Sequence, residues 1–420
     1  MFQRTELPDG PRVISARLPG TRSLAVAAYV LVGSRLESRE RSGMAHFMEH
    51  LTFKGTEAFP TTRALSEAIE GVGGTSNAAT DRESTVYWTR LPVREAERGF
   101  SVLADLVARP LLRREDIARE RDIIVEEIRS YRDDPGQYIY NVFDETFFGD
   151  TSLGWEIAGD ETSVRGLADD DIREFWRAGY RPANIVVAVA GDLSHEQAVD
   201  FVSASFGRGN GAVPTFGAAP HLPAKRFTVQ PRGTSQAHLC LGVTALPRDH
   251  PDQWALELLN TVLGDGSSSR LFLHLREEAG LAYDVHSFTT DYSDCGVLQL
   301  YAGVAPEDLA KTLKALLREL ADLRDELVPP EELTKARNYA VGRLELRLEE
   351  SRNLSAWLGA QEALHDRVMT LDEAVAALDA VTAEQIREVA ARLFRDDALS
   401  LAVIAPGRYG RTLERHLALP

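Results

Sequence analysis

Two histidines and a glutamate lie close together near the start of the chain, in the pentapeptide HFMEH at 46–50. The surrounding segment, 43–53, predicts a helix, and on a helix positions i, i+3 and i+4 share one face. His46 and His50 can therefore bind one metal ion, while the Glu49 carboxylate points into the same space without being a ligand. The competing interpretation, two buried histidines with ordinary hydrogen bonds, accounts for a single histidine better than for the full H-x-x-E-H pattern.

Zinc suits this set of side chains. Imidazole and carboxylate groups both bind Zn²⁺, and a catalytic zinc site keeps one position open for water. A zinc-bound water has a pKa of about 7, and a nearby carboxylate can accept its proton during attack on a peptide carbonyl. We therefore expect one Zn²⁺ per chain, with Glu49 as the base; Mn²⁺ and Co²⁺ are alternatives that the sequence leaves open.

A catalytic zinc site needs a third protein ligand, which we expect from a second helix. Segment 114–132 predicts such a helix, with an apolar stripe made of Ile117, Ile124, Ile128 and Tyr131. Glu120 and Glu127 lie together along one flank of this stripe, whereas Glu126 points the opposite way. The spacing does not decide between Glu120 and Glu127, and an exposed acidic flank paired with arginines would give the same pattern.

The elements that position these residues alternate between strand and helix patterns. In the first half, strands are predicted at 12–18, 24–32, 84–91 and 185–190, and further helices at 62–70, 94–108, 138–147 and 195–206. In the second half, strands are predicted at 237–244, 296–304 and 399–405, and helices at 252–263 and 270–278. Antiparallel sheets covered by helices account for this order.

The chain is expected to contain two domains. Its 420 residues exceed the ~100–200 residues of a usual domain. The Gly- and Pro-rich stretch at 207–224 predicts a linker, which we place at 211–226, between an N-terminal domain (1–210) and a C-terminal domain (227–420). The apolar strand LSLAVIA at 399–405 is similar to IVVAVA at 185–190, which indicates duplication of one α+β unit.

Charge and composition exclude several classes of function. The formal net charge of −17 repels nucleic acids and anionic membranes and favours cationic partners. The N-terminus lacks a signal pattern and no stretch reaches the ~18 apolar residues needed to span a bilayer, so we expect no membrane partner and a cytoplasmic location. Cys240 and Cys295, the two cysteines, do not indicate a disulfide framework.

Two longer segments resemble the inverzincin M16 family, which includes mitochondrial processing peptidase, pitrilysin and insulysin. They are GMAHFMEHLTFKGT at 43–56 and ARERDIIVEEIRSYRDDP at 118–135, and the length is that of the short, processing-peptidase-like branch. The resemblance implies an α+β fold of two homologous domains, each an antiparallel-rich mixed sheet covered by helices. It also implies that Glu127 is the third zinc ligand, that Glu120 orients a ligand or assists proton transfer, and that the second domain binds no metal.

Two further segments resemble the substrate-binding parts of the same family. TSNAATDRESTVYW at 75–88 is similar to the segment that supplies an edge strand for an extended peptide, which implies roles for Asn77 and Ala78. GDGSSSRLFLHLREEAGLAYDVHSF at 264–288 resembles the C-terminal substrate-binding segment, with Arg276 and Tyr283 as the residues that bind the peptide and its oxyanion.

The sequence thus predicts a zinc endopeptidase that hydrolyses extended or unfolded peptides inside a chamber. The larger relatives enclose a chamber between four such domains, so the resemblance implies a homodimer. The negative net charge of the chain predicts a preference for basic peptides. The alternative is a non-catalytic structural or assembly subunit of the same fold, for which an intact H-x-x-E-H pattern has no physical use.

Overall fold

The chain folds into two compact units. The computed structural model describes residues 2–8, 10–209, 215–220, 223–407 and 409–420, with only the backbone of Arg411. Unit 1 comprises Met1–Arg129, Glu156–Gly217 and Glu345–Thr370, and unit 2 comprises Ser130–Trp155, Ala218–Leu344 and Leu371–Pro420. Parts of the predicted linker, residues 211–214 and 221–222, lie outside the described residues.

Unit 1 is built on a six-stranded mixed sheet with the order β1-β2-β6-β3-β5-β4. Strands β2 and β6 are parallel and the other neighbours are antiparallel. The strands are β1 (Phe2–Glu6), β2 (Arg12–Arg17), β3 (Ser23–Val30), β4 (Thr75–Thr80), β5 (Thr85–Pro92) and β6 (Ile185–Gly191). Strand β4 therefore forms one edge of the sheet, as the sequence predicts.

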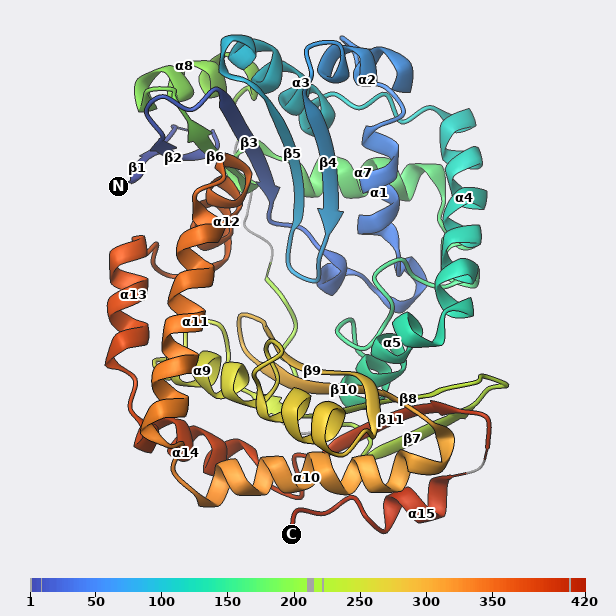
Figure 1. Cartoon of the computed structure of the whole chain (residues 1–420). Helices are drawn as coiled ribbons and strands as arrows, with labels where there is room; N and C mark the ends of the chain where they lie inside the picture. Colours follow the sequence, from blue (N-terminus) through green and yellow to red (C-terminus); the bar gives the residue numbers. More distant parts are fainter. Residues whose placement is uncertain (1, 9, 210–214, 221–222, 408) are drawn as a thin grey trace. The chain divides into compact units, whose positions relative to one another are not determined.

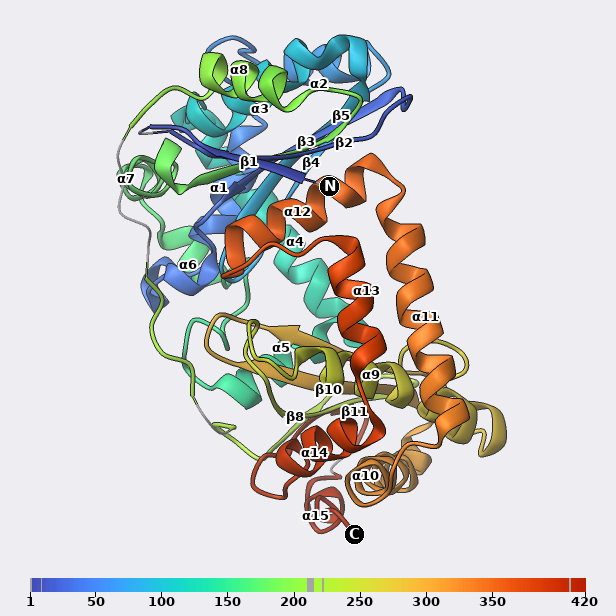
Figure 2. The ribbon, with the colours of Figure 1, turned by 90° about the vertical axis from the view of Figure 1, so that its left-hand side faces the viewer.

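Helices cover both faces of this sheet (Figure 1, Figure 2). The helices of unit 1 are α1 (Met44–Thr52), α2 (Thr62–Glu70), α3 (Ala96–Ala108), α4 (Arg114–Asp133, the last four residues in unit 2), α6 (Glu161–Gly166), α7 (Asp169–Gly179), α8 (His195–Ser205) and α12 (Ser351–Leu364), with 3-10 turns at Ser34–Leu36, Arg39–Arg41, Val93–Glu95 and Pro182–Asn184. Side chains alternate along β3, so Val26 and Ala28 pack with α1 and α3, whereas Tyr29 packs with α12. Both faces are buried, which explains the uninterrupted apolar sequence of β3 and β6.

Unit 2 repeats this design with a five-stranded sheet of order β7-β11-β8-β10-β9. Its strands are β7 (Phe227–Pro231), β8 (Ala237–Ala245), β9 (Ala282–Asp291), β10 (Gly296–Val304) and β11 (Ser400–Ala405). Its helices are α5 (Pro135–Phe148), α9 (Gln253–Leu263), a π-helix (Leu271–Glu278), a 3-10 turn (Pro306–Asp308), α10 (Leu309–Asp325), α11 (Pro330–Leu348, ending in unit 1), α13 (Leu371–Ala380), α14 (Ala383–Leu393) and α15 (Gly410–Glu414).

The two sheets have the same connectivity. Strands β7, β8, β9, β10 and β11 take the places of β2, β3, β4, β5 and β6, including the single parallel pair, β11 with β7. The predicted α+β class with two repeated domains is therefore confirmed. The segment at 270–278, expected to be an ordinary helix, is instead a π-helix.

Helix α5 belongs to the N-terminal half of the chain but is part of unit 2. Helix α12 belongs to the C-terminal half but is part of unit 1. Helix α5 packs on β8 and β11 of unit 2 through Phe143 and Phe147, and α12 packs on β2, β3 and β6 of unit 1 through Leu358. The compact units therefore assign these two helices crosswise, whereas the predicted ranges 1–210 and 227–420 keep each half continuous. Each of these helices covers an apolar face of a sheet. Burying that face removes apolar area from water, and this stabilises the packing of the helix on the sheet.

Among the described residues, no helix combines the length and apolar character that crossing a bilayer requires.

Two helix glycines give a test of the packing of α12. A Cβ atom at Gly359 would lie 2.8 Å from the Ala188 Cβ and still closer to the Tyr29 ring, whereas nothing lies within 4 Å of a Cβ at Gly342 in α11. Gly359→Ala should lower the unfolding midpoint, because overpacking costs about 1–3 kcal/mol and exceeds the roughly 1 kcal/mol gained in helix propensity. Gly342→Ala should raise it. Calorimetry checks both, and a raised midpoint for Gly359→Ala would contradict the close approach.

Candidate metal centre

Helix α1 presents His46 and His50 on one face. Its opposite face, with Met44, Phe47 and Met48, is buried in the core of unit 1. Gly43 precedes the helix in the left-handed region (φ 93°), and a Cβ there would lie 2.5 Å from the Ala158 carbonyl oxygen, so only glycine fits without strain. The two histidine rings lie 4.6 Å apart between centroids.

Glu37 holds the beginning of α1. Its buried carboxylate accepts hydrogen bonds from the backbone N–H of Gly43 (2.8 Å) and of Ala45 (2.7 Å), which have no partner within the helix. Burial raises the pKa of Glu37 to about 8, against the lowering effect of these bonds. The sequence analysis missed Glu37; an acidic residue shortly before a helix start was the available signal.

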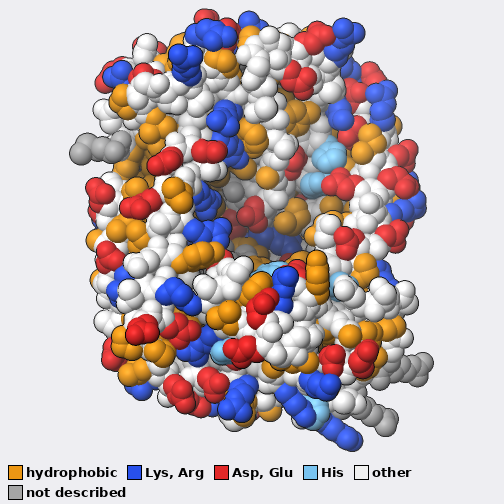
Figure 3. Space-filling model, viewed as in Figure 1, with side chains coloured by type: hydrophobic (Ala, Val, Ile, Leu, Met, Phe, Trp, Pro, Cys, Tyr) orange, Lys and Arg blue, Asp and Glu red, His pale blue; other side chains and the backbone are white. Residues whose placement is uncertain are grey.

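Glu127 of α4 lies close to both histidines. Its Oε1 is 3.8 Å from His46 Nε2 and its Oε2 is 3.4 Å from His50 Nε2. One ligand atom from each of the three residues lies within 4.8 Å of the others. Figure 3 shows histidine side chains at the surface over α1, beside acidic side chains. The structure thus brings together the three side chains that the sequence predicts as ligands.

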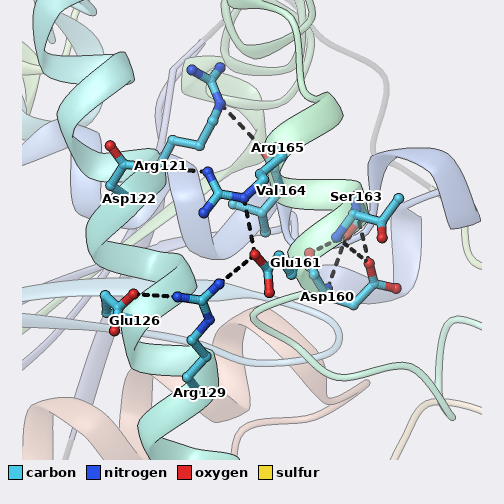
Figure 4. A network of polar contacts seen from close by, with 10 residues as sticks. Arg121, Asp122, Glu126, Arg129, Asp160, Glu161, Ser163, Val164 and Arg165 are labelled. Carbon is cyan, nitrogen blue, oxygen red and sulfur yellow. Dashed lines mark hydrogen bonds and ion pairs between the residues drawn. The ribbon is translucent and has the colours of Figure 1, made fainter.

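Packing and ion pairs fix the rotation of α4. Ile117, Ile124 and Ile128 are buried as predicted, but Tyr131 is 36% exposed, so the buried stripe ends before it. On the outer side, Arg129 joins Glu126 to Glu161 of α6 at 2.6 Å each (Figure 4). In the same network Arg165 contacts Asp122 and Glu161, and Arg121 donates to the carbonyl of Val164. Glu126 therefore points away from α1, as predicted.

Glu120 contacts the ring nitrogen of His50 that does not face Glu127. Its buried carboxylate lies 3.2 Å from His50 Nδ1 and 2.9 Å from Lys54 Nζ. Burial tends to raise the pKa of Glu120, but the hydrogen bonds from His50 and Lys54 outweigh it and the net shift is downward. An ionised carboxylate on Nδ1 leaves Nε2 as the nitrogen available to a metal ion. Lys54 was missed, although it lies only four positions after His50, just beyond the end of α1.

Glu49 lies beside the histidines in a mostly buried position. Burial raises its pKa, and a hydrogen bond from the Thr80 hydroxyl to Oε2, 2.6 Å long, acts in the opposite direction. A carboxylate with a raised pKa is better matched to proton transfer near neutral pH. Thr80 was also missed; the alternation of β4 from Ala78 gave the signal, since residues two apart share a face.

The predicted substrate-binding residues lie on two edge strands and a helix. Asn77 and Ala78 are on β4, where the Ala78 N–H donates to the Asn77 side chain at 2.9 Å. Within unit 2, Arg276 of the π-helix contacts the rings of Phe272 and Tyr283, at 4.8 and 5.4 Å. Arg276 and Tyr283 both line a pocket of about 400 Å³, and Tyr283 is 77% exposed. The roles of these four residues stay predictions.

The chemistry of the His46, His50 and Glu127 side chains fits zinc. Burial, with a further contribution from His50, lowers the pKa of His46 to about 4, so this imidazole is neutral at pH 7, as metal binding requires. Two imidazoles and one carboxylate form a catalytic zinc set with an open fourth position. Among the described residues, no other group of three or more His, Cys, Asp or Glu side chains lies close enough together to hold a metal ion. Helix α9, which takes the place of α1 in unit 2, contains no histidine.

Comparisons with known proteins cover both halves of the chain. The family model described as insulinase (peptidase family M16) matches residues 12–161, and that described as peptidase M16 inactive domain matches residues 167–339. An uncharacterized zinc protease of Streptomyces coelicolor is 37% identical, over 96% of this chain and 89% of the relative. Another, of Bacillus subtilis, is 32% identical, over 97% and 98%.

A solved structure agrees with these sequence matches. The crystal structure of a protease from Helicobacter pylori superimposes with a TM-score of 0.90 at 25% identity, and covers 97% of this chain and 99% of that chain. The resemblance read from 43–56 and 118–135 is thereby confirmed. Since the matches extend over both halves and relatives more than 30% identical align over nearly their full lengths, the chain belongs to peptidase family M16.

Proposed function

We propose that this protein is a zinc-dependent endopeptidase that cleaves extended or unfolded peptides. The observation that carries the proposal is the approach of His46, His50 and Glu127 to one another, with the Glu49 carboxylate on the same helix face. Relatives that span almost the whole chain are named zinc proteases, which supports the same activity.

Each side chain would have a distinct task. His46, His50 and Glu127 would hold Zn²⁺, and Glu120 would keep His50 in the tautomer that binds through Nε2. When bound, zinc would supply a Lewis acid that polarises the peptide carbonyl and makes a water molecule more acidic. Glu49 would accept the proton of the attacking water and later donate a proton to the leaving amine.

The peptide would bind as an added strand. Strand β4 is an edge strand, so backbone groups on its outer side have no neighbouring strand among the described residues of unit 1. An extended peptide that pairs there is recognised by conformation more than by side chains, with Asn77 and Ala78 at the contact. Arg276 and Tyr283 would bind the peptide and its developing oxyanion, from the second copy of a homodimer.

Three finer expectations go with this proposal. The net charge of −17 favours basic peptides, since an acidic surface attracts them. A cytoplasmic location and the homodimer rest on the sequence and the family resemblance. The alternative of a non-catalytic subunit would leave Glu49 without a task, and the first experiment below separates the two.

Glu49→Gln should abolish turnover without loss of zinc. Gln keeps the shape of the side chain but cannot accept a proton, so kcat should fall about 10²–10⁴-fold. Glu126→Gln is a matched control, because Glu126 is exposed and paired with Arg129 on the far side of α4. A fluorogenic peptide assay gives kcat and metal analysis gives zinc per chain. Wild-type turnover in Glu49→Gln would refute the assigned base.

Glu127→Gln should weaken zinc binding. A neutral amide oxygen is a poorer ligand than a carboxylate, so we expect a loss of affinity of at least 10-fold, on the order of that for removing an outer partner of a zinc ligand. Titration against a chromophoric chelator measures the affinity, with Glu126→Gln again as the control. An unchanged zinc-to-protein ratio and affinity would instead favour Glu120 as the third ligand.

The homodimer can be tested by sedimentation. The expected mass is twice the 46.3 kDa of one chain, at micromolar concentration and physiological salt. A dilution series in the presence and absence of zinc separates assembly from metal binding. A single species at the mass of one chain throughout that range, in an active preparation, would contradict the homodimer.

A further inference from the structure

A hydroxyl group on the edge strand contacts the proposed base. Thr80 Oγ1 donates to Glu49 Oε2 over 2.6 Å, between residues that lie 31 positions apart in the chain. A hydrogen bond to a carboxylate is shorter and stronger than one between neutral groups. Among the described residues, the Thr80 hydroxyl is the one side-chain group that donates a hydrogen bond to the Glu49 carboxylate.

The direction of the Thr80 side chain follows from the strand. Along β4 the exposed and half-buried residues alternate, and Ala78 packs against the core that contains the apolar face of α1. Thr80 lies two residues further on, so its side chain points to the same face. It pairs with Thr85 of β5, whose own hydroxyl is buried and donates to the Val32 carbonyl at 2.9 Å. The backbone that carries Thr80 is therefore well fixed.

The side chain of Glu49, in contrast, has several rotatable bonds. A general base must stay within hydrogen-bonding distance of the proton that it accepts, and a misplacement of about 1 Å can cost 10²-fold in rate. A carboxylate has two oxygens, so a hydrogen bond that holds one of them leaves capacity on the other for a proton. Thr80 supplies such a restraint from the strand along which the peptide is proposed to pair.

We propose that Thr80 is a positioning residue for the catalytic base: its hydroxyl holds the Glu49 carboxylate in the orientation for proton transfer. This inference rests on the proposed peptidase activity. It assigns a task to the end of the edge strand that is separate from substrate pairing at Asn77 and Ala78. The loss of the hydroxyl should therefore affect kcat and leave KM and zinc binding almost unchanged.

The test compares Thr80→Val with Thr80→Ser. Valine has the shape of threonine and suits a strand but has no hydroxyl, so kcat should fall about 10- to 100-fold with KM within about twofold, as for a hydrogen bond to a charged group. Serine keeps the hydroxyl and should restore most of the kcat. Thr75→Val is the control, because Thr75 lies exposed at the other end of the same strand.

Zinc affinity and the unfolding midpoint provide readouts that do not depend on turnover. The zinc affinity and the unfolding midpoint of Thr80→Val should both match those of the wild type. In a chain that already carries Glu49→Gln, adding Thr80→Val should not lower the residual kcat further. If the wild type cleaves peptides and Glu49→Gln does not, wild-type kcat in Thr80→Val would overturn this inference alone. Equal losses in the Val and Ser variants with a lowered unfolding midpoint would show a structural role and would also overturn it. An inactive, zinc-loaded wild type would instead overturn the peptidase proposal.

Discussion

A site shared between two helices depends on the rotation of each helix about its own axis. One residue along an α-helix corresponds to about 100°, so a shift of a single position in α4 would turn Glu127 away from α1. Both rotations are fixed by groups outside the site. Helix α1 is held by its apolar face and by Glu37 at its first turn, and α4 by its buried isoleucines and its ion pairs with α6.

Four glutamates lie in or near the candidate site, and each has different neighbours and a different degree of burial. Glu37 is buried on backbone N–H groups, Glu120 is buried between His50 and Lys54, and Glu49 is mostly buried with a threonine hydroxyl. Glu127 remains half exposed beside both imidazoles. A buried carboxylate is stable only with donors that satisfy it, and these donors determine which of the groups orients a neighbour and which is available to bind a cation.

The sequence predicts the parts of this site that lie close together along the chain. Helical spacing places His46, Glu49 and His50 on one face, and the stripe of α4 excludes Glu126. The sequence does not decide which of Glu120 and Glu127 is the third ligand, because both lie on the flank that faces α1. Their depths of burial depend on packing against residues 70 or more positions away in the chain. Thr80 contacts Glu49 across 31 positions and was missed for a similar reason, whereas Glu37 lies only six positions before Gly43 and left a local signal.

At the scale of the fold, the predicted strands and helices of the first half agree with the structure within a few residues. The crosswise exchange of α5 and α12 does not follow from any local pattern. Both are ordinary amphipathic helices, and the choice of sheet depends on which apolar face is left uncovered. Tyr131 illustrates the same limit, since periodicity continues the stripe beyond the point where the core ends.

The repeat shows which features belong to the shared fold and which belong to the candidate metal centre. Helices α1 and α9 occupy the same place in their units, each after the second of the repeated strands and against an edge strand. In α1 one face carries imidazoles to the surface, whereas α9 buries a run of leucines, including Leu256 and Leu258. The fold can therefore keep its packing with or without imidazoles on that helix face. What distinguishes unit 1 is a few polar residues on two helices and an edge strand, so function here is a property of the site and not of the fold.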